Sequence, residues 1–190
     1  MIRRIPILAS IVVLAAVAVM VSLGLWQLQR LHEKEALLAT YAAARTDAAE
    51  IAWTGKGPGE HLLYRRARLE CVNVTGHSSM AGRNGKGDSG IAQTAQCTLP
   101  DGGTAKVVLG WAMTPDAGKG WSGGTVRGVI APGPRLVADP PLGGLQANAI
   151  PDPSEIPNNH FSYAMQWFFF AATALVIYAL ALWKRGTKAA

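Results

Sequence analysis

The sequence predicts a membrane protein in which two transmembrane α-helices, one N-terminal and one C-terminal, bracket a single β-rich α+β domain. Two uncharged apolar runs support this prediction: residues 5–26 form a run of 22, and residues 161–183 form a run of 23. Because an α-helix rises about 1.5 Å per residue, each run is long enough to cross a hydrocarbon core of about 30 Å. The residues between the runs show short strand-like patterns separated by glycine-rich turns, which are typical of a β-rich domain.

The surplus positive charge of the chain lies beside the two runs. All 12 acidic residues and 12 of the 18 basic residues fall within residues 31–160, so this stretch is formally neutral. The net charge of +6 therefore comes from six flanking residues: Arg3, Arg4, Arg30, Lys184, Arg185 and Lys188. Basic residues are enriched on the cytoplasmic side of membrane spans, so both termini are predicted to be cytoplasmic. The excess of basic residues is thus explained by membrane topology, and no nucleic-acid partner is expected.

This orientation divides the chain into five parts. We expect a cytoplasmic N-terminus at 1–4, a transmembrane helix at 5–27, an exported domain with an N-terminal helical extension at 28–158, a second transmembrane helix at 159–183 and a cytoplasmic C-terminus at 184–190. No mitochondrial transit peptide is evident, so the predicted location is a bacterial inner membrane with the central domain in the periplasm. A cleaved signal peptide is the alternative for the first run, but 22 apolar residues exceed the usual apolar core of about 7–15.

The elements between the spans follow from local patterns. Leu31, Leu38 and Tyr41 recur at helical spacing, so the first helix should continue beyond the membrane and end before the glycine-rich segment 53–59. Strands are expected at 62–74, 91–99, 105–113 and 125–131, with a hairpin turn at 100–103. Frequent glycine predicts a flexible loop at 80–90, and frequent proline and glycine predict an irregular return to the membrane at 132–157.

The two cysteines, Cys71 and Cys97, both fall in the exported part. Disulfides persist in oxidising compartments, and the two residues lie in strand-like stretches that could pair across a hairpin. This favours a structural disulfide. A two-cysteine metal site is the alternative, but the spacing is long and neither cysteine has a Cys-x-x-Cys partner or an adjacent histidine.

Chemically distinctive residues gather where the two runs meet the exported domain. The first junction carries the pattern Gly-x-Trp-Gln-x-x-Arg, formed by Gly24, Trp26, Gln27 and Arg30. The second carries Asn-His-x-x-Tyr-Ala-x-x-Trp-Phe, formed by Asn159, His160, Tyr163, Ala164, Trp167 and Phe168. Both patterns, with their order and their distance from the ends, resemble those of the Surfeit locus protein 1 family of cytochrome c oxidase assembly factors.

The middle of the chain resembles this family less closely. Tyr64-Arg65-Arg66 is similar to the entry of a family strand, and Gly110-Trp111 is similar to the end of an Arg-Gly-Trp strand. Leu109 replaces the arginine of that strand. The resemblance is therefore specific over about thirty residues, although it covers the whole layout.

The resemblance implies a non-enzymatic protein that assists the assembly of a haem-copper (aa3-type) cytochrome c oxidase. Its implied role is haem a insertion into the catalytic subunit, or stabilisation of that subunit. The implied partners are the catalytic subunit and haem a or haem a synthase, with haem a bound transiently. On this chain His160 would be the ligand of the haem iron, and the other implied cofactor-binding residues are Trp26, Arg30, Tyr163 and Trp167.

The same residues also permit a structural interpretation. Asn158 or Asn159 would cap the second helix, with His160 in its first turn, while the tryptophans and tyrosine would form an interfacial belt. Gln27 and Gln166 could hydrogen-bond to each other or to backbone if the helices pack together, or they could face a transmembrane helix of a partner.

Other functions and other histidines are less well supported. No His-Glu-x-x-His or Walker loop is present, and the glycine-rich run at 82–90 lacks the strand-loop-helix context that phosphate binding needs. A cofactor-free accessory subunit or scaffold that stays bound to the oxidase is the main alternative, and a copper-handling protein is disfavoured because no soft-ligand cluster occurs. His32 is a weaker second-ligand candidate, and His61 and His77 are expected to be solvent-exposed in loops.

Overall fold

The structure is a computed structural model that describes residues 6–47, 49–54, 57 and 59–187. The chain separates into two compact units. The helical unit comprises Met1–Leu37 and Pro157–Ala190, and the sheet unit comprises Leu38–Ile156. Two apolar helices thus bracket a mixed β-sheet domain, which confirms the predicted fold class at this level.

Two long helices dominate the chain, α1 (Ile7–Thr46) and α2 (His160–Thr187). Both are long and apolar enough to cross a membrane, with mean hydropathy of 2.7 and 1.8 in their most apolar windows. Only 6% of either window is buried within the structure, so most of the apolar side chains face outward. As predicted, α1 continues well beyond the apolar run and ends before residue 53.

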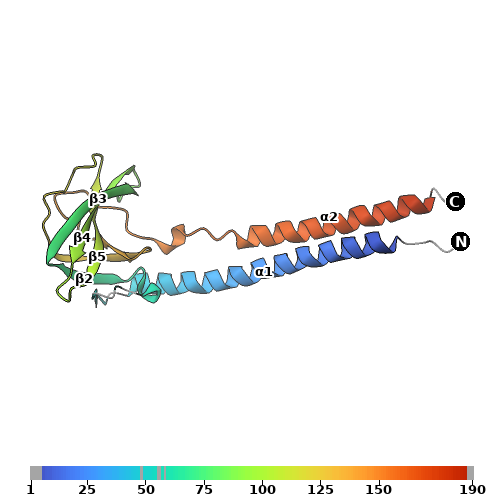
Figure 1. The fold of residues 1–190 in the computed structure, drawn as a ribbon, viewed down its shortest axis with the longest axis horizontal. Helices are drawn as coiled ribbons and strands as arrows, with labels where there is room; N and C mark the ends of the chain where they lie inside the picture. The colour runs from blue at the N-terminus through green and yellow to red at the C-terminus, as the bar shows by residue number, and fades with distance from the viewer. Residues whose placement is uncertain (1–5, 48, 55–56, 58, 188–190) are drawn as a thin grey trace. The chain divides into compact units, whose positions relative to one another are not determined.

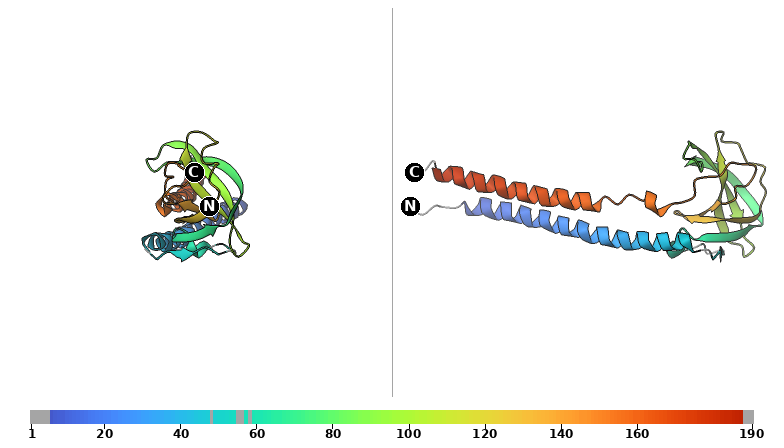
Figure 2. Two further views of the ribbon diagram at one scale, coloured as in Figure 1. Left: turned by 90° about the vertical axis from the view of Figure 1, so that its left-hand side faces the viewer. Right: turned by 180° about the vertical axis from the view of Figure 1, so that it is seen from behind.

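Within the helical unit, α1 and α2 run side by side along one seam (Figures 1 and 2). On α1 the seam residues, which are partly or fully buried, recur three and four apart: Ser10, Val13, Val17, Met20, Gly24 and Gln27. On α2 the corresponding residues are His160, Ala164, Trp167, Ala171, Ala174 and Tyr178. Alternating spacings of three and four residues are typical of coiled-coil packing. The helices are antiparallel, since Ser10 hydrogen-bonds to Tyr178 at one end and Gln27 to His160 at the other.

The sheet unit contains one seven-stranded sheet, part of which is labelled in Figure 1. Its strands are β1 (Ile51–Ala52), β2 (Arg66–Cys71), β3 (Asn73–Arg83), β4 (Ser89–Thr98), β5 (Thr104–Ala112), β6 (Gly124–Ala131) and β7 (Arg135–Ala138). Their spatial order is β1-β2-β6-β7-β5-β4-β3. The β1–β2 and β5–β7 pairs are parallel and the other pairs are antiparallel. Two short 3-10 turns, η1 (Glu60–Leu62) and η2 (Pro153–Glu155), complete the unit.

The sheet curls around its hydrophobic core. Cys71 in β2 and Cys97 in β4 form a disulfide, although three strands lie between β2 and β4 in the sheet. Four strand spacings would separate them by roughly 19 Å in a flat sheet. The curled interior is filled by fully buried aliphatic side chains, the largest being Leu109, Ile130 and Leu136.

The segment 80–90 is not the predicted flexible loop. It contains the end of β3, a tight turn and the start of β4. Asn84, which is buried, organises this turn: its Oδ1 accepts hydrogen bonds from the backbone N–H groups of Lys86 and Asp88, both at 2.9 Å, and its Nδ2 donates to the Asp88 carboxylate at 2.8 Å. Two glycines of this segment allow close packing, because a Cβ on Gly82 would lie 2.7 Å from Cβ of Ala92 and a Cβ on Gly90 would lie 2.4 Å from the Trp111 ring.

Two other predicted segments differ from the structure. The single strand expected at 62–74 is divided into η1, β2 and the start of β3, with Val72 between the two strands. The segment 132–157 is largely irregular, as predicted, but it also contains η2 and the strand β7, which lies between β6 and β5. The predicted hairpin at 100–103 is confirmed between β4 and β5, and the strand predicted at 125–131 is confirmed as β6.

Asp152 is expected to make the stability of the sheet unit depend on pH. Its carboxylate accepts a hydrogen bond from the backbone N–H of Ser154 at 2.9 Å and pairs with the guanidinium of Arg45. These contacts, above all the one with Ser154, lower the pKa of Asp152 below its ordinary value of 3.8. Stabilisation of this kind is complete above the pKa of the unfolded state and is lost as the pH falls through the folded-state pKa.

We therefore expect Asp152→Asn to flatten the acid dependence of unfolding. The thermal midpoint of the full-length protein in lipid nanodiscs, followed by tryptophan fluorescence, should fall less between about pH 5 and pH 3 than in the wild type. Asp116→Asn is the control, because it removes a carboxylate from an exposed pair with Lys119. An equally steep acid dependence in Asp152→Asn would contradict the prediction.

Candidate functional site

His160 is the first residue of α2 and is held by a residue of α1. Its ring is partly buried, and its Nδ1 lies 2.7 Å from Oε1 of Gln27. Both residues occupy the seam of the helical unit. A polar pair of this type, with one partner from each helix, links the two helices and orients both side chains.

Gly24 allows the helices to approach closely near this pair. A Cβ on Gly24 would lie 2.5 Å from Cε1 of Phe168, so no other residue fits without displacing the phenyl ring or the helix. On α2, Ala164 and Ala171 are also buried in the seam. Small residues at such positions let helix backbones approach one another. The glycine of the first sequence pattern thus has a packing role that spacing alone did not reveal.

Trp26 and Arg30 lie elsewhere on α1. Trp26 precedes Gln27 by one residue, so helical geometry places it on the face of α1 away from the seam, and its side chain is 51% exposed. Arg30 is exposed and pairs with Glu33 of the same helix at 2.7 Å. The structure therefore does not bring Trp26 or Arg30 to His160.

The aromatic residues of α2 have mixed environments. Trp167 is partly buried in the seam, with its ring edge-on to Phe170 at a centroid distance of 6.2 Å. Tyr163 lies one turn from His160 but is 51% exposed, and Phe161 is exposed as well. Together these side chains give the start of α2 an outward-facing apolar and aromatic surface beside His160.

The remaining polar candidates are separate from His160. Gln166 and His32 are exposed, so the predicted Gln27–Gln166 contact is replaced by the Gln27–His160 pair. The backbone carbonyl of Asn159 accepts a hydrogen bond from Tyr163 N–H at 3.2 Å, which begins α2. The side-chain oxygen of Asn158 is buried without a hydrogen-bond partner among the described residues.

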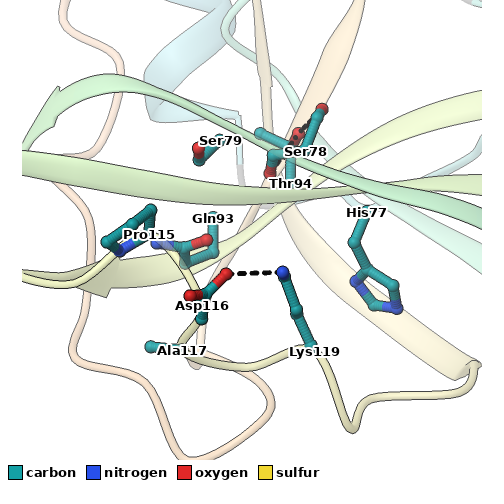
Figure 3. A pocket seen from close by; sticks show the side chains of 9 residues that line it. All are labelled: His77, Ser78, Ser79, Gln93, Thr94, Pro115, Asp116, Ala117 and Lys119. Atoms are coloured by element: carbon teal, nitrogen blue, oxygen red, sulfur yellow. Dashed lines mark hydrogen bonds and ion pairs between the residues drawn. The ribbon is translucent and has the colours of Figure 1, made fainter.

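A small polar hollow of about 180 Å³ lies in the sheet unit, between β3, β4 and the segment after β5 (Figure 3). Its floor includes Gln93 and Thr94, whose side chains are buried and donate hydrogen bonds to the backbone oxygens of Thr114 and Ser78. At its rim Asp116 pairs with Lys119. The polar side chains of the floor thus already have hydrogen-bond partners within the protein. Among the described residues, no group of three or more His, Cys, Asp or Glu side chains is placed to hold a metal ion.

His77 and His61 are exposed, as predicted, but His77 lies in strand β3 rather than in a loop. Strand β3 lies at the edge of the sheet and most of its side chains are exposed, although Val74 and Met80 are partly buried against the core. His61 lies in η1.

The middle sequence patterns have structural roles. Leu109, where the family pattern has an arginine, is fully buried in the core. A Cβ on Gly110 would lie 2.4 Å from that of Leu145, and the backbone N–H of Trp111 donates to Gln146 at 2.7 Å. Tyr64 packs against Tyr41 with a ring centroid distance of 4.9 Å. These residues build the sheet unit.

The fold and the site define a protein with two helices long and apolar enough to cross a membrane, a mixed-sheet domain between them and a histidine–glutamine pair in the helical seam. The sequence matches the model of the SURF1 family over residues 14–172, and the chain belongs to this family. The resemblance found in the two junction patterns is thereby confirmed. The family is generally linked to cytochrome c oxidase assembly. No curated protein matches the sequence.

Proposed function

We propose that this protein assists the assembly of a haem-copper cytochrome c oxidase by holding haem a at His160 while the catalytic subunit is completed. The observation that carries this proposal is the position of His160, which starts α2 and is oriented by a residue of the other helix. Imidazole nitrogen is a common ligand of haem iron. A single ligand in a partly exposed position suits a carrier that must release its cargo.

The residues around His160 fit an apolar cofactor in part. Phe161 and Tyr163 are exposed near His160 and would cover apolar porphyrin surface. Trp167 is partly buried between the two helices and contributes to their packing. Bound haem a would supply the iron centre that the oxidase requires. Trp26 and Arg30 lie away from His160, so they are not part of this proposed haem contact.

The proposal places the protein in a bacterial inner membrane, with both termini in the cytoplasm and the sheet unit in the periplasm. The positive charges flanking the apolar runs support this orientation. The disulfide between Cys71 and Cys97 supports an oxidising compartment for the sheet unit.

A cofactor-free accessory subunit or scaffold remains the second candidate function, and the position of Trp26 favours it. Trp26 exposes an aromatic surface on the face of α1 that α2 does not cover. Such a surface could contact a transmembrane helix of the oxidase. A scaffold would need this face and would not need His160.

Replacing His160 tests the two candidates against each other. In cells lacking the wild-type chain, His160→Ala should leave the oxidase deficient in haem a3 and in activity, because the imidazole ligand is lost. Haem a3 content would be measured from visible difference spectra of the membranes. His32→Ala is the control, since His32 is exposed on α1.

Three outcomes separate the possibilities. Normal haem a3 in His160→Ala, with a deficiency in Trp26→Ala, would favour the scaffold. Normal haem a3 after complete removal of the chain would contradict any role in assembly. A haem a absorption band in the purified wild-type protein that is absent from His160→Ala would support the carrier.

A further inference from the structure

We propose that Gln27 is a positioning residue that holds the His160 ring in the tautomer whose Nε2 carries a free lone pair for iron. This inference rests on the proposed function, because it names the residue that orients the ligand of the same site. It also assigns a task to the glutamine of the first junction pattern, which the sequence alone left open between several partners.

The atoms of the contact determine the tautomer. Oε1 of Gln27 lies 2.7 Å from Nδ1 of His160. An amide oxygen only accepts hydrogen bonds, so Nδ1 must carry the proton and donate it. The other ring nitrogen of a neutral imidazole, Nε2, is then the acceptor. Hydrogen bonds from the second ring nitrogen fix the tautomer and the orientation of metal-binding histidines in the same way.

The packing of the seam keeps Gln27 in place. Gln27 lies one turn from Gly24, where the ring of Phe168 allows no additional atom. The two helices are therefore held close together beside the pair. Gln29, only two residues further along α1, is exposed and instead donates a hydrogen bond to Glu33 at 3.0 Å. Gln29 thus provides a matched control of the same residue type on a different face.

The first measurement is the protonation of the His160 ring in the full-length protein in lipid nanodiscs, without haem. Histidine labelled with the heavy nitrogen isotope reports the tautomer through its ring nitrogen NMR shifts, and the His160→Ala spectrum identifies the signal. We expect a proton on Nδ1 in the wild type. Gln27→Met, which has a similar size but no acceptor oxygen, should shift His160 to the Nε2-protonated form that prevails in free histidine.

Two further variants separate positioning from a general structural effect. Gln27→Glu keeps an acceptor oxygen at the same place, so it should retain the proton on Nδ1. Gln29→Met should leave the His160 signal unchanged. This comparison does not require haem, so it tests the orientation of His160 independently of the proposed cargo.

The second measurement is the affinity of the same proteins for added haem a, followed by visible absorption. Gln27→Met should weaken binding by about 10–100-fold, as is typical when an outer-shell partner of a metal ligand is removed. Gln27→Glu should retain affinity to within a few-fold, and Gln29→Met should bind like the wild type.

The outcomes distinguish this inference from the proposed function. A proton on Nε2 in the wild type, or an unchanged tautomer in Gln27→Met, overturns the positioning role whatever the haem result. A tautomer shift with unchanged haem a affinity overturns the link between orientation and binding. The expected tautomers in a wild-type protein that binds no haem a would support the orientation by Gln27 and overturn haem a as the cargo.

Discussion

Replacing both cysteines, as Cys71→Ala with Cys97→Ala, is expected to lower the free energy of unfolding of the sheet unit by about 3–4 kcal/mol. The disulfide closes a loop with a sequence separation of 26. Without it the unfolded chain regains conformational freedom, which stabilises the unfolded state. The effect should be pronounced in this fold, because the bridge joins β2 to β4 across the curled sheet rather than linking neighbouring strands.

Urea unfolding of the full-length protein in lipid nanodiscs would measure this change. The buried Trp53 and Trp111 of the sheet unit provide the fluorescence signal. Wild-type protein treated with a reductant should unfold at the same urea concentration as the double variant, and the reductant should not affect the variant itself. Equal stability of the oxidised wild type and the double variant would show that the bridge contributes nothing.

Gly24→Leu is expected to disrupt the helical seam and to break the Gln27–His160 hydrogen bond. Even a single Cβ at this position would lie 2.5 Å from the Phe168 ring, and a leucine side chain is larger still. Phe168 lies about two turns along α2 from His160, so relief of this overlap must move the ring or the helix that carries His160. The oxidase of cells with this variant should then be as deficient in haem a3 as in His160→Ala cells.

Difference spectra of membranes, normalised to the amount of the protein, would measure this effect. Ala15→Leu is the matched control, because it adds similar bulk to an exposed position on the face of α1 away from the seam. Gly24→Leu cells with normal haem a3, or an equal loss in Ala15→Leu cells, would contradict the importance of the close contact at Gly24.

Long elements with a clear local pattern were predictable from the sequence, and short elements within glycine- or proline-rich segments were not. The spacing of Leu31, Leu38 and Tyr41 predicted the extension of α1 correctly. Strand β7 has only four residues and forms a tight hairpin with β6, but the proline and glycine of the connecting residues 132–134 suggested irregular structure instead. Composition likewise suggested a flexible loop where Asn84 in fact organises a tight turn.

The residues of the candidate site were predictable from the sequence, but their contacts were not. The two junction patterns indicated His160 and Gln27 as notable residues, but not that they would meet. Successive residues of a helix point about 100° apart, so Gln27 faces α2 while its neighbour Trp26 faces away. The rotation of each helix about its axis is decided by packing at Gly24 and Phe168, which lie on different helices.

The sequence by itself determined that this chain has two helices apolar and long enough to span a membrane, a β-rich segment between them and the junction patterns of its family. Each of these properties belongs to a stretch of consecutive residues, so it can be recognised directly in the sequence. Only the tertiary structure decided that His160 meets Gln27, that Phe168 covers Gly24 and that Trp26 faces outward. Such contacts depend on the rotation and register of elements far apart in sequence, which side-chain packing selects and local patterns do not encode.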